Sequence, residues 1–170
     1  MRKNQSSFKI DETDYALLAL LQKDGRASNV KLAENLNLSE TPCWRRLKRL
    51  EDSGFIKGYQ ANLNRRLLGF GVLAFVQICF AIHTDDSPEQ FEKAIQEIPE
   101  ILSCHNVTGE ADYLLEIVSE DLETYEKLLR RVIRRLPGVT SIKSSFSLRE
   151  VKASTNLPLV GDKPSVESLV

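Results

Sequence analysis

Cysteine is scarce in this sequence, with three among 170 residues, and no long apolar run is present. Cys43, Cys79 and Cys104 are odd in number and widely spaced, so they predict neither a disulfide framework nor a metal site. Unpaired thiols of this kind favour a reducing, cytoplasmic location. No apolar stretch reaches the roughly 18–20 residues of a membrane span, and the start of the chain has no apolar signal core. We therefore expect a protein without a membrane partner.

Side chains suited to catalysis are also lacking. The two histidines, His83 and His105, have no partners at metal-ligand spacing, and a solvated turn is the favoured interpretation of His83. Cys104 and His105 are adjacent in an expected strand, where neighbouring side chains point to opposite faces, so they do not form a reactive pair. We expect no catalytic residues, no metal and no cofactor. An enzyme built on the second half of the chain is the remote alternative.

The net charge of −1 conceals an asymmetry between the two halves of the chain. Residues 1–66 hold 13 Lys and Arg against 8 Asp and Glu, a net charge of +5. Residues 67–170 hold 10 against 16, a net charge of −6. A basic module joined to an acidic one suggests different partners for each, one of them a polyanion.

The basic half predicts a series of short helices. The stretch DETDYALLALLQKDG has a wide apolar stripe, can be capped by Asp11 or Thr13, and ends at Gly25. A second helical pattern follows Ser28 and is broken after a few residues by NLNLSE. The third helix lies in SETPCWRRLKRLEDSGFI, which holds the only Trp and four cations within six positions.

This third helix is predicted to begin at Ser39 or Thr41 and to end near Gly54. Pro42 then falls in the first turn, where a missing N–H costs nothing. On a helical wheel, one stripe is apolar and the opposite face is cationic. A short helix, a tight turn and an amphipathic basic helix are the pattern of a helix-turn-helix motif.

The cationic face predicts contacts to double-stranded DNA, because Arg bonds guanine edges while Lys, Ser and Thr more often hold phosphate. A solvated charged face is the alternative on charge alone, and the Trp ring can pack on the sugar-phosphate edge or in the domain core. The predicted contact residues are Ser39, Thr41, Pro42, Trp44, Arg45, Arg46, Lys48 and Arg49.

The second half has a different pattern. FIKGYQANLN at 55–64 has alternating β-type character, and NRRLLGFG after it resembles a hinge. From residue 72 the patterns predict strand, helix, strand, strand, helix and strand, with a helix over 121–138. This βαββαβ order is that of a ferredoxin-like fold. We expect a helix-turn-helix domain over 9–62, a linker over 63–71, a second domain over 72–156 and a loose tail over 157–170.

A four-stranded sheet of this kind exposes one face. Either Val72, Ala74, Val76, Ile78 and Phe80 or their alternates would lie in water, and pairing two sheets face to face would cover them. Composition and element order therefore predict a homodimer.

VTGEADY is the second informative stretch. Gly109 allows a turn that is unfavourable for other residues. Its N–H groups, with Thr108, can hold an α-carboxylate, and Asp112 can hold an α-ammonium group or instead cap the strand turn. A plain β-turn is the alternative, because GEAD is good turn chemistry.

From about residue 9 to about 158 the chain resembles the Lrp/AsnC (feast/famine) bacterial transcription regulators. TPCWRRLKRLEDSG resembles their DNA-binding half, and VTGEADYLLEI, RRLPGV and SSFSLREVKASTNLPL resemble their effector module, called RAM. The resemblance implies an α+β fold, with a winged helix-turn-helix joined to the ferredoxin-like domain. It also implies assembly of dimers into octamers and an effector cleft at the G-x-x-D loop. The implied effector residues are His105, Val107, Thr108, Gly109, Glu110 and Asp112.

We therefore expect a cytoplasmic regulator that binds promoter DNA and responds to an amino acid. The subgroup that these motifs resemble includes regulators of branched-chain amino acid, methionine or cysteine metabolism. An architectural DNA-binding protein without an effector is the alternative.

Overall fold

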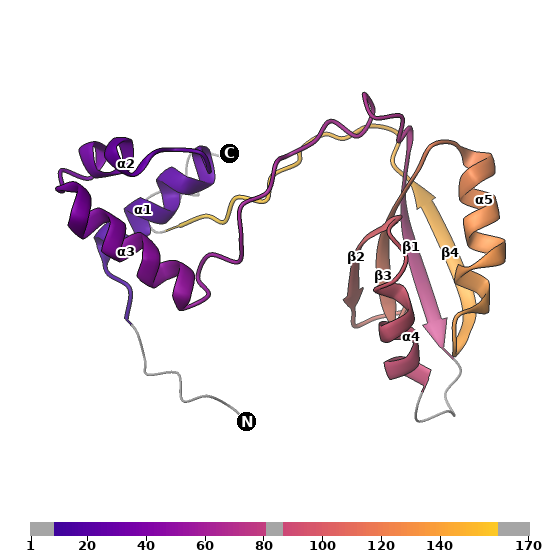
Figure 1. Ribbon diagram of the computed structural model, residues 1–170. Coiled ribbons are helices and arrows are strands. Elements are labelled where there is room, and N and C mark those ends of the chain that lie inside the picture. The colour runs from indigo at the N-terminus through magenta and orange to yellow at the C-terminus, as the bar shows by residue number, and fades with distance from the viewer. Residues whose placement is uncertain (1–8, 81–86, 160–170) are drawn as a thin grey trace, which may run out of the picture. The chain divides into compact units, whose positions relative to one another are not determined.

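The computed structural model describes residues 9–80 and 87–159 (Figure 1). The described part of Met1–Asn62 and Ser154–Val170 forms one unit, and Leu63–Ala153 forms the second. The chain thus leaves the first unit at Asn62. It re-enters that unit at Ser154. Because the side chain of Gln22 exchanges hydrogen bonds of 2.6 and 3.1 Å with the backbone of Leu157, the start of this segment is attached to the first unit.

The first unit consists of α1 (Glu12–Lys23), α2 (Asn29–Asn35) and α3 (Glu40–Asp52). Asp11 caps α1 in a capping box, and the Ser28 hydroxyl accepts a bond in the first turn of α2. Both helix starts lie where the sequence predicts them.

The end of α3 is set by a glycine. Gly54 has a φ of +76°, a left-handed conformation that side chains disfavour. The N–H of Gly54 donates to Glu51 O, and the N–H of Phe55 donates to Leu50 O, both at 3.0 Å. This is a Schellman ending, which confirms the predicted stop.

The core of the first unit lies between its helices, where Leu17, Leu32, Cys43 and Leu50 are buried. Leu47 packs against this cluster, so the predicted apolar stripe of α3 is confirmed. Transfer of such side chains from water is worth about 1.5–3 kcal/mol each. Apolar burial therefore holds α3 against the other two helices.

The alternating pattern of residues 55–64 forms no strand in the described chain, so this expectation was wrong. A strand needs a hydrogen-bonded neighbour, and the described chain has no strand pairing at this segment.

The second unit has the predicted βαββαβ order, with a sheet of strand order β2-β3-β1-β4 in which all neighbours are antiparallel. The expected helix over 121–138 is divided into an α-helix and a short 3₁₀ turn. The elements are β1 (Val72–Phe80), α4 (Ser87–Ile95), β2 (Ile101–Asn106), β3 (Tyr113–Ser119), α5 (Leu122–Arg131), η1 (Ile133–Arg135) and β4 (Val139–Phe146).

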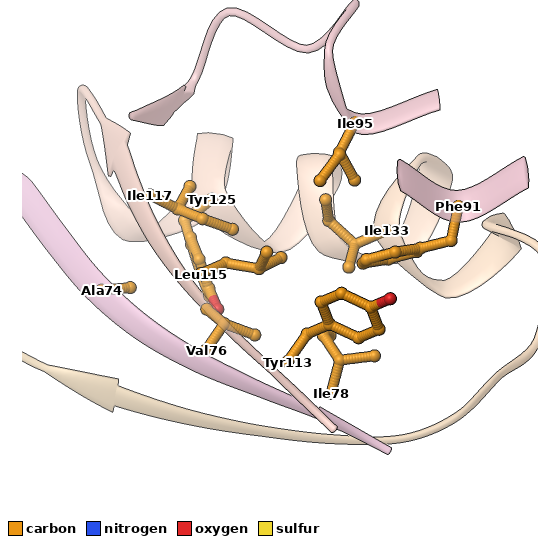
Figure 2. Close-up of a cluster of buried hydrophobic side chains, with 10 residues drawn as sticks. All are labelled: Ala74, Val76, Ile78, Phe91, Ile95, Tyr113, Leu115, Ile117, Tyr125 and Ile133. Carbon is orange, nitrogen blue, oxygen red and sulfur yellow. The ribbon is translucent and has the colours of Figure 1, made fainter. Parts of the chain in front are cut away.

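Helices α4 and α5 cover one face of this sheet (Figure 1). Figure 2 shows strand residues such as Val76 and Ile78 beneath Phe91 of α4, with Tyr125 of α5 in the same cluster. The rings of Phe91 and Tyr113 lie 4.8 Å apart between centroids. Of the two sets left open by the sequence, the one containing Ala74, Val76 and Ile78 is therefore the covered set.

The alternate residues lie on the open face. Strand register places Phe75 beside Glu116 and Ser145, and Gln77 beside Leu114. Phe75 is 41% exposed although it belongs to a central strand. This face therefore has an apolar centre with polar neighbours. Separately, none of the helices described here is long and apolar enough to cross a membrane.

Candidate DNA-binding surface and ligand-binding loop

The outer side of α3 carries the exposed members of the predicted DNA-binding set. Trp44 is 55% exposed, so of the two alternatives for this ring the domain core is excluded. Thr41, Pro42 and Arg45 are also exposed. Arg45 makes no hydrogen bond or ion pair with any residue that the structure describes, and its five N–H donors are available.

The first turn of α3 is open. Ser39 occupies the N-cap position, but its hydroxyl makes no capping bond. The first N–H groups of a helix have no partner within the helix, and Pro42 has no N–H. The side chain of Asn29 donates to Glu40 O at 2.9 Å and ties this turn to α2. Backbone donors and a hydroxyl are thus presented together at the start of α3.

Two of the predicted DNA-binding cations have partners within the protein. Nη1 of Arg46 lies 2.7 Å from Asp11 Oδ2 and 2.8 Å from Asp14 Oδ1. Nη2 of Arg49 lies 3.0 Å from Asp14 Oδ2. The Asp14 side chain is fully buried, whereas those of Arg46 and Arg49 are 27% and 44% exposed. We call these four residues the Asp14 cluster.

Titration within the Asp14 cluster follows its hydrogen bonds. Bonds to Asp11 and then Asp14 raise the pKa of the Arg46 guanidinium. The backbone N–H of Asp14, followed by Arg46, lowers the pKa of the Asp11 carboxyl. Both effects favour the charged forms of Arg46 and Asp11, so the ion pair between these two residues persists at neutral pH.

The remaining cation of the predicted set, Lys48, pairs with Asp52 at 2.8 Å on the exposed surface. Exposed pairs of this i,i+4 type contribute only about 0.3–0.5 kcal/mol. Lys48 therefore exchanges its partner at little cost, in contrast to Arg46 and Arg49, which share a buried carboxylate. The helical wheel could not distinguish these cases, because Asp11 and Asp14 lie more than 30 residues away in sequence.

The G-x-x-D loop joins β2 to β3. Gly109 has a φ of +124°, and a Cβ placed there would meet no atom within 4 Å. Backbone conformation rather than space therefore requires glycine. Thr108 and Glu110 are exposed and Val107 is partly buried, so the loop presents polar groups at its surface.

Asp112 closes this loop against β1. Its Oδ2 accepts the N–H of Phe80 at 2.7 Å, and its own N–H donates to Ile78 O at 2.9 Å. Its carbonyl oxygen accepts the N–H of Val107 at 3.0 Å. Of the two roles open in the sequence, strand capping is thus present. Oδ1 of Asp112 has no hydrogen-bond donor among the described residues.

Residues from other strands meet this loop, and sequence spacing gave no signal for them. Lys143 Nζ lies 3.3 Å from Glu110 Oε2, and Cys79 Sγ lies 3.4 Å from Glu110 O. His105, by contrast, is paired with Leu114 in the sheet and belongs to the open face rather than the loop.

His83 lies outside the described residues. Within the described ranges, no group of three or more His, Cys, Asp or Glu side chains has the arrangement of a metal site.

Family models match both halves of the chain. A winged helix-turn-helix DNA-binding model matches residues 10–57, and an Lrp/AsnC ligand binding domain model matches residues 73–157. The leucine-responsive regulatory protein of Escherichia coli K12 is 43% identical over 155 residues, which cover 91% of this chain and 94% of that protein.

Solved structures agree. A transcriptional regulator of Neisseria meningitidis in complex with L-Met superposes with a TM-score of 0.85 at 38% identity, covering 88% of this chain and 97% of that one. A feast or famine regulatory protein of M. tuberculosis complexed with L-methionine gives 0.79 at 31% identity, covering 88% and 99%. The relatives are regulators rather than enzymes. With a DNA-binding helix-turn-helix at one end and a ligand-binding domain at the other, this chain belongs to the Lrp/AsnC family of transcriptional regulators.

Proposed function

We propose that this regulator reads duplex DNA with the outer side of α3, led by its first turn and Arg45. The observation that supports this most directly is the two-sided character of α3. Cys43 and Leu50 are buried against the other helices, whereas Trp44 and Arg45 face outward. Arg45 has the paired N–H groups that match a guanine edge, and the Ser39 hydroxyl suits a phosphate oxygen.

The remaining residues of the predicted DNA-binding set differ in how strongly they are bonded to other groups of the protein. Thr41 and Lys48 lie at the exposed surface and suit phosphate contacts. Arg46 and Arg49 reach DNA only by giving up or sharing their bonds to the buried Asp14 carboxylate.

Arg45→Gln tests the proposed base contact. The probes are a duplex enriched by the wild-type protein from a randomised pool, and the starting pool itself. Loss of a base contact should weaken binding to the enriched duplex by about 5- to 150-fold, with a much smaller effect on the pool.

Arg130→Gln on α5 is the matched control, because it removes the same charge from the other unit. An equal loss on both probes would mean that Arg45 touches phosphate only. An unchanged affinity for the enriched duplex would contradict the proposed reading face.

For the ligand we propose an amino acid bound at the G-x-x-D loop. The two relatives named above were solved with L-methionine, and the E. coli relative is named for its response to leucine. In this chain, Gly109 opens the loop backbone and Asp112 has a carboxylate oxygen available. These groups complement an α-carboxylate and an α-ammonium group.

The neighbouring loop residues would select the ligand side chain. Val107, Thr108 and Glu110 surround the loop, and Glu110 is held by Lys143. His105 belongs to this site only if a ligand or second copy bridges the loop and the open sheet face.

Asp112→Asn tests this assignment, because it removes the charge but keeps an oxygen for the N–H of Phe80. Calorimetry with L-leucine and L-methionine should show binding to the wild type and at least about tenfold weaker binding to the variant. Glu123→Gln, an exposed change on α5 in the same unit, should bind as the wild type does. Equal affinity for Asp112→Asn would refute the ammonium contact. The absence of any response to an amino-acid panel would favour an architectural DNA-binding protein.

We also propose a homodimer formed through the open sheet face, with dimers assembling further into an octamer. An apolar centre that contains Phe75 and Leu114 supports this arrangement. Phe75→Lys should lower the molar mass measured by light scattering, while Thr124→Lys, an exposed change on α5 that adds the same charge away from this face, serves as the control. An unchanged mass for Phe75→Lys would exclude this face as the interface.

Regulation then follows from linkage between assembly and ligand. An amino acid that binds two assemblies with different affinities shifts their balance and changes the spacing of the recognition helices. We place this activity in the cytoplasm, where the proposed DNA and amino-acid partners meet.

A further inference from the structure

The Asp14 cluster joins the start of α1 to the middle of α3. Asp14 is the third residue of α1 and forms the capping box with Asp11, in which the N–H of Asp14 donates to Asp11 Oδ1 at 2.9 Å. The N–H of Asp11 in turn donates to Asp14 Oδ2 at 3.2 Å. These reciprocal bonds hold the Asp14 carboxylate in place independently of α3.

The carboxylate then makes contact with α3 at two points. Arg46 and Arg49 are three residues apart and lie on one flank of the helix. Two anchors on one flank restrict the rotation of α3 about its axis as well as its distance from α1. The apolar contacts of Leu50 and Cys43 are non-directional and restrict rotation less, whereas charge-assisted hydrogen bonds depend on geometry.

The rotation of α3 matters for base contacts. With side chains included, a helix has a radius of roughly 5–6 Å, so a rotation of about 20° moves an outward side chain by about 2 Å. That displacement breaks a hydrogen bond to a base edge. Contacts to phosphate by flexible side chains tolerate it better.

We propose that Asp14 is a positioning residue for DNA reading, and that Arg46 and Arg49 hold α3 in register rather than contact DNA. This inference rests on the proposed role of α3 as the reading helix. It gives a function to the buried Asp14. It also means that Arg46 and Arg49 stabilise the DNA-binding surface instead of forming part of it.

Asp14→Asn is the main test, with the enriched duplex and the randomised pool as probes. The change removes the carboxylate charge that Arg46 and Arg49 share, although Arg46 keeps its bond to Asp11. The two guanidinium groups are then held less tightly and can turn towards phosphates. Affinity for the pool should rise, and its salt slope should steepen by about 0.9 for each additional phosphate that the protein neutralises. The ratio of affinities, enriched duplex over pool, should fall by about 5- to 150-fold, the value of one base contact.

Asp52→Asn is the matched control. It removes the same charge from the protein and leaves the exposed Lys48 without its partner, but it does not touch the Asp14 cluster. Affinity for the pool should rise here too, while the ratio of affinities stays at the wild-type value. A ratio that falls equally in Asp52→Asn and Asp14→Asn would overturn the inference, because charge alone would then explain the effect.

Arg46→Lys separates positioning from phosphate contact without creating an unpaired buried acid. Lysine holds phosphate well but cannot bond Asp11 and Asp14 as a planar fork. We expect a lower ratio of affinities for this variant, with an unchanged salt slope. A wild-type ratio would show that Arg46 acts through its charge, and would overturn the inference.

Urea unfolding followed by the fluorescence of Trp44 checks that each variant is folded under the binding conditions. A wild-type protein that enriches no duplex from the pool would refute the proposed reading role of α3, and this inference with it. A different result would refute the positioning role alone. In that case the wild-type protein strongly prefers the enriched duplex, and the Asp14→Asn variant keeps the same ratio of affinities.

Discussion

Leu50→Ala should unfold the DNA-binding unit selectively. Leu50 lies on the inner side of α3 and is completely buried in a cluster with Leu17, Leu32 and Cys43. Truncation of a buried leucine costs about 2–5 kcal/mol, depending on how far the cavity collapses. A unit of this length has a stability of only about 3–8 kcal/mol. The variant should therefore be marginally folded and should lose DNA binding at ordinary temperature.

Trp44 makes this effect measurable in one unit, because it is the only Trp in the chain and is on α3. A small domain loses roughly 1 kcal/mol of stability per molar urea, so the fluorescence midpoint should fall by about 2–5 M. Circular dichroism reports both units, so a transition that Trp44 fluorescence does not show belongs to the second unit. Amino-acid binding should persist there.

Ile117→Ala is the matched core truncation in the second unit, since Ile117 is completely buried beneath the helices. It should leave the Trp44 transition in place. If Ile117→Ala moves that transition as far as Leu50→Ala does, the units do not unfold separately and the reasoning fails. An unmoved midpoint for Leu50→Ala would contradict its place in the core.

Three further predictions follow from the described contacts. Gly54→Ala should destabilise the first unit by about 1 kcal/mol, because Gly54 has a left-handed backbone conformation. Gly58→Ala should not destabilise it, because Gly58 has open space around it and no such conformation. Urea unfolding curves of the two variants test this difference. Burial, and then the nearby Glu92 charge, raise the pKa of Cys104 to about 11, so this thiol should react slowly with iodoacetamide at pH 8, as read by mass spectrometry; native labelling as fast as in urea would contradict this. Burial, and then a hydrogen bond to Glu92, raise the pKa of Tyr113 to about 12. Its contribution to stability should be complete below its unfolded pKa of 10.0 and should be lost as pH rises towards about 12, seen as falling midpoints by circular dichroism.

Local features were predictable from the sequence because they depend on near neighbours. Asp11 and Ser28 start helices through bonds to N–H groups three residues away, and Gly54 ends one through its own backbone. The βαββαβ order and the apolar stripe of α3 follow from periodicity, which is also local. The DNA-binding helix and the G-x-x-D loop could be located on this basis.

The roles of individual side chains within those sites were less predictable. Arg45 and Arg46 are adjacent and chemically identical, yet one faces outward and the other bonds Asp11 and Asp14. Asp112 has the chemistry of a ligand contact, but Oδ2 already caps β1. Such partners are brought together by packing and strand pairing, so sequence distance conceals them.

By itself, the sequence determined the division into a basic and an acidic half, the positions of most helices and strands, and the side of α3 that would be apolar. Only the tertiary structure decided which face of the sheet is covered, that the segment after Ser154 bonds Gln22, and which cations of α3 pair with Asp14. The physical reason is range. Helix caps and hydrophobic periodicity act over three or four residues. The hydrogen bonds of Arg46, in contrast, go to carboxylates that lie 32 and 35 residues away in the sequence.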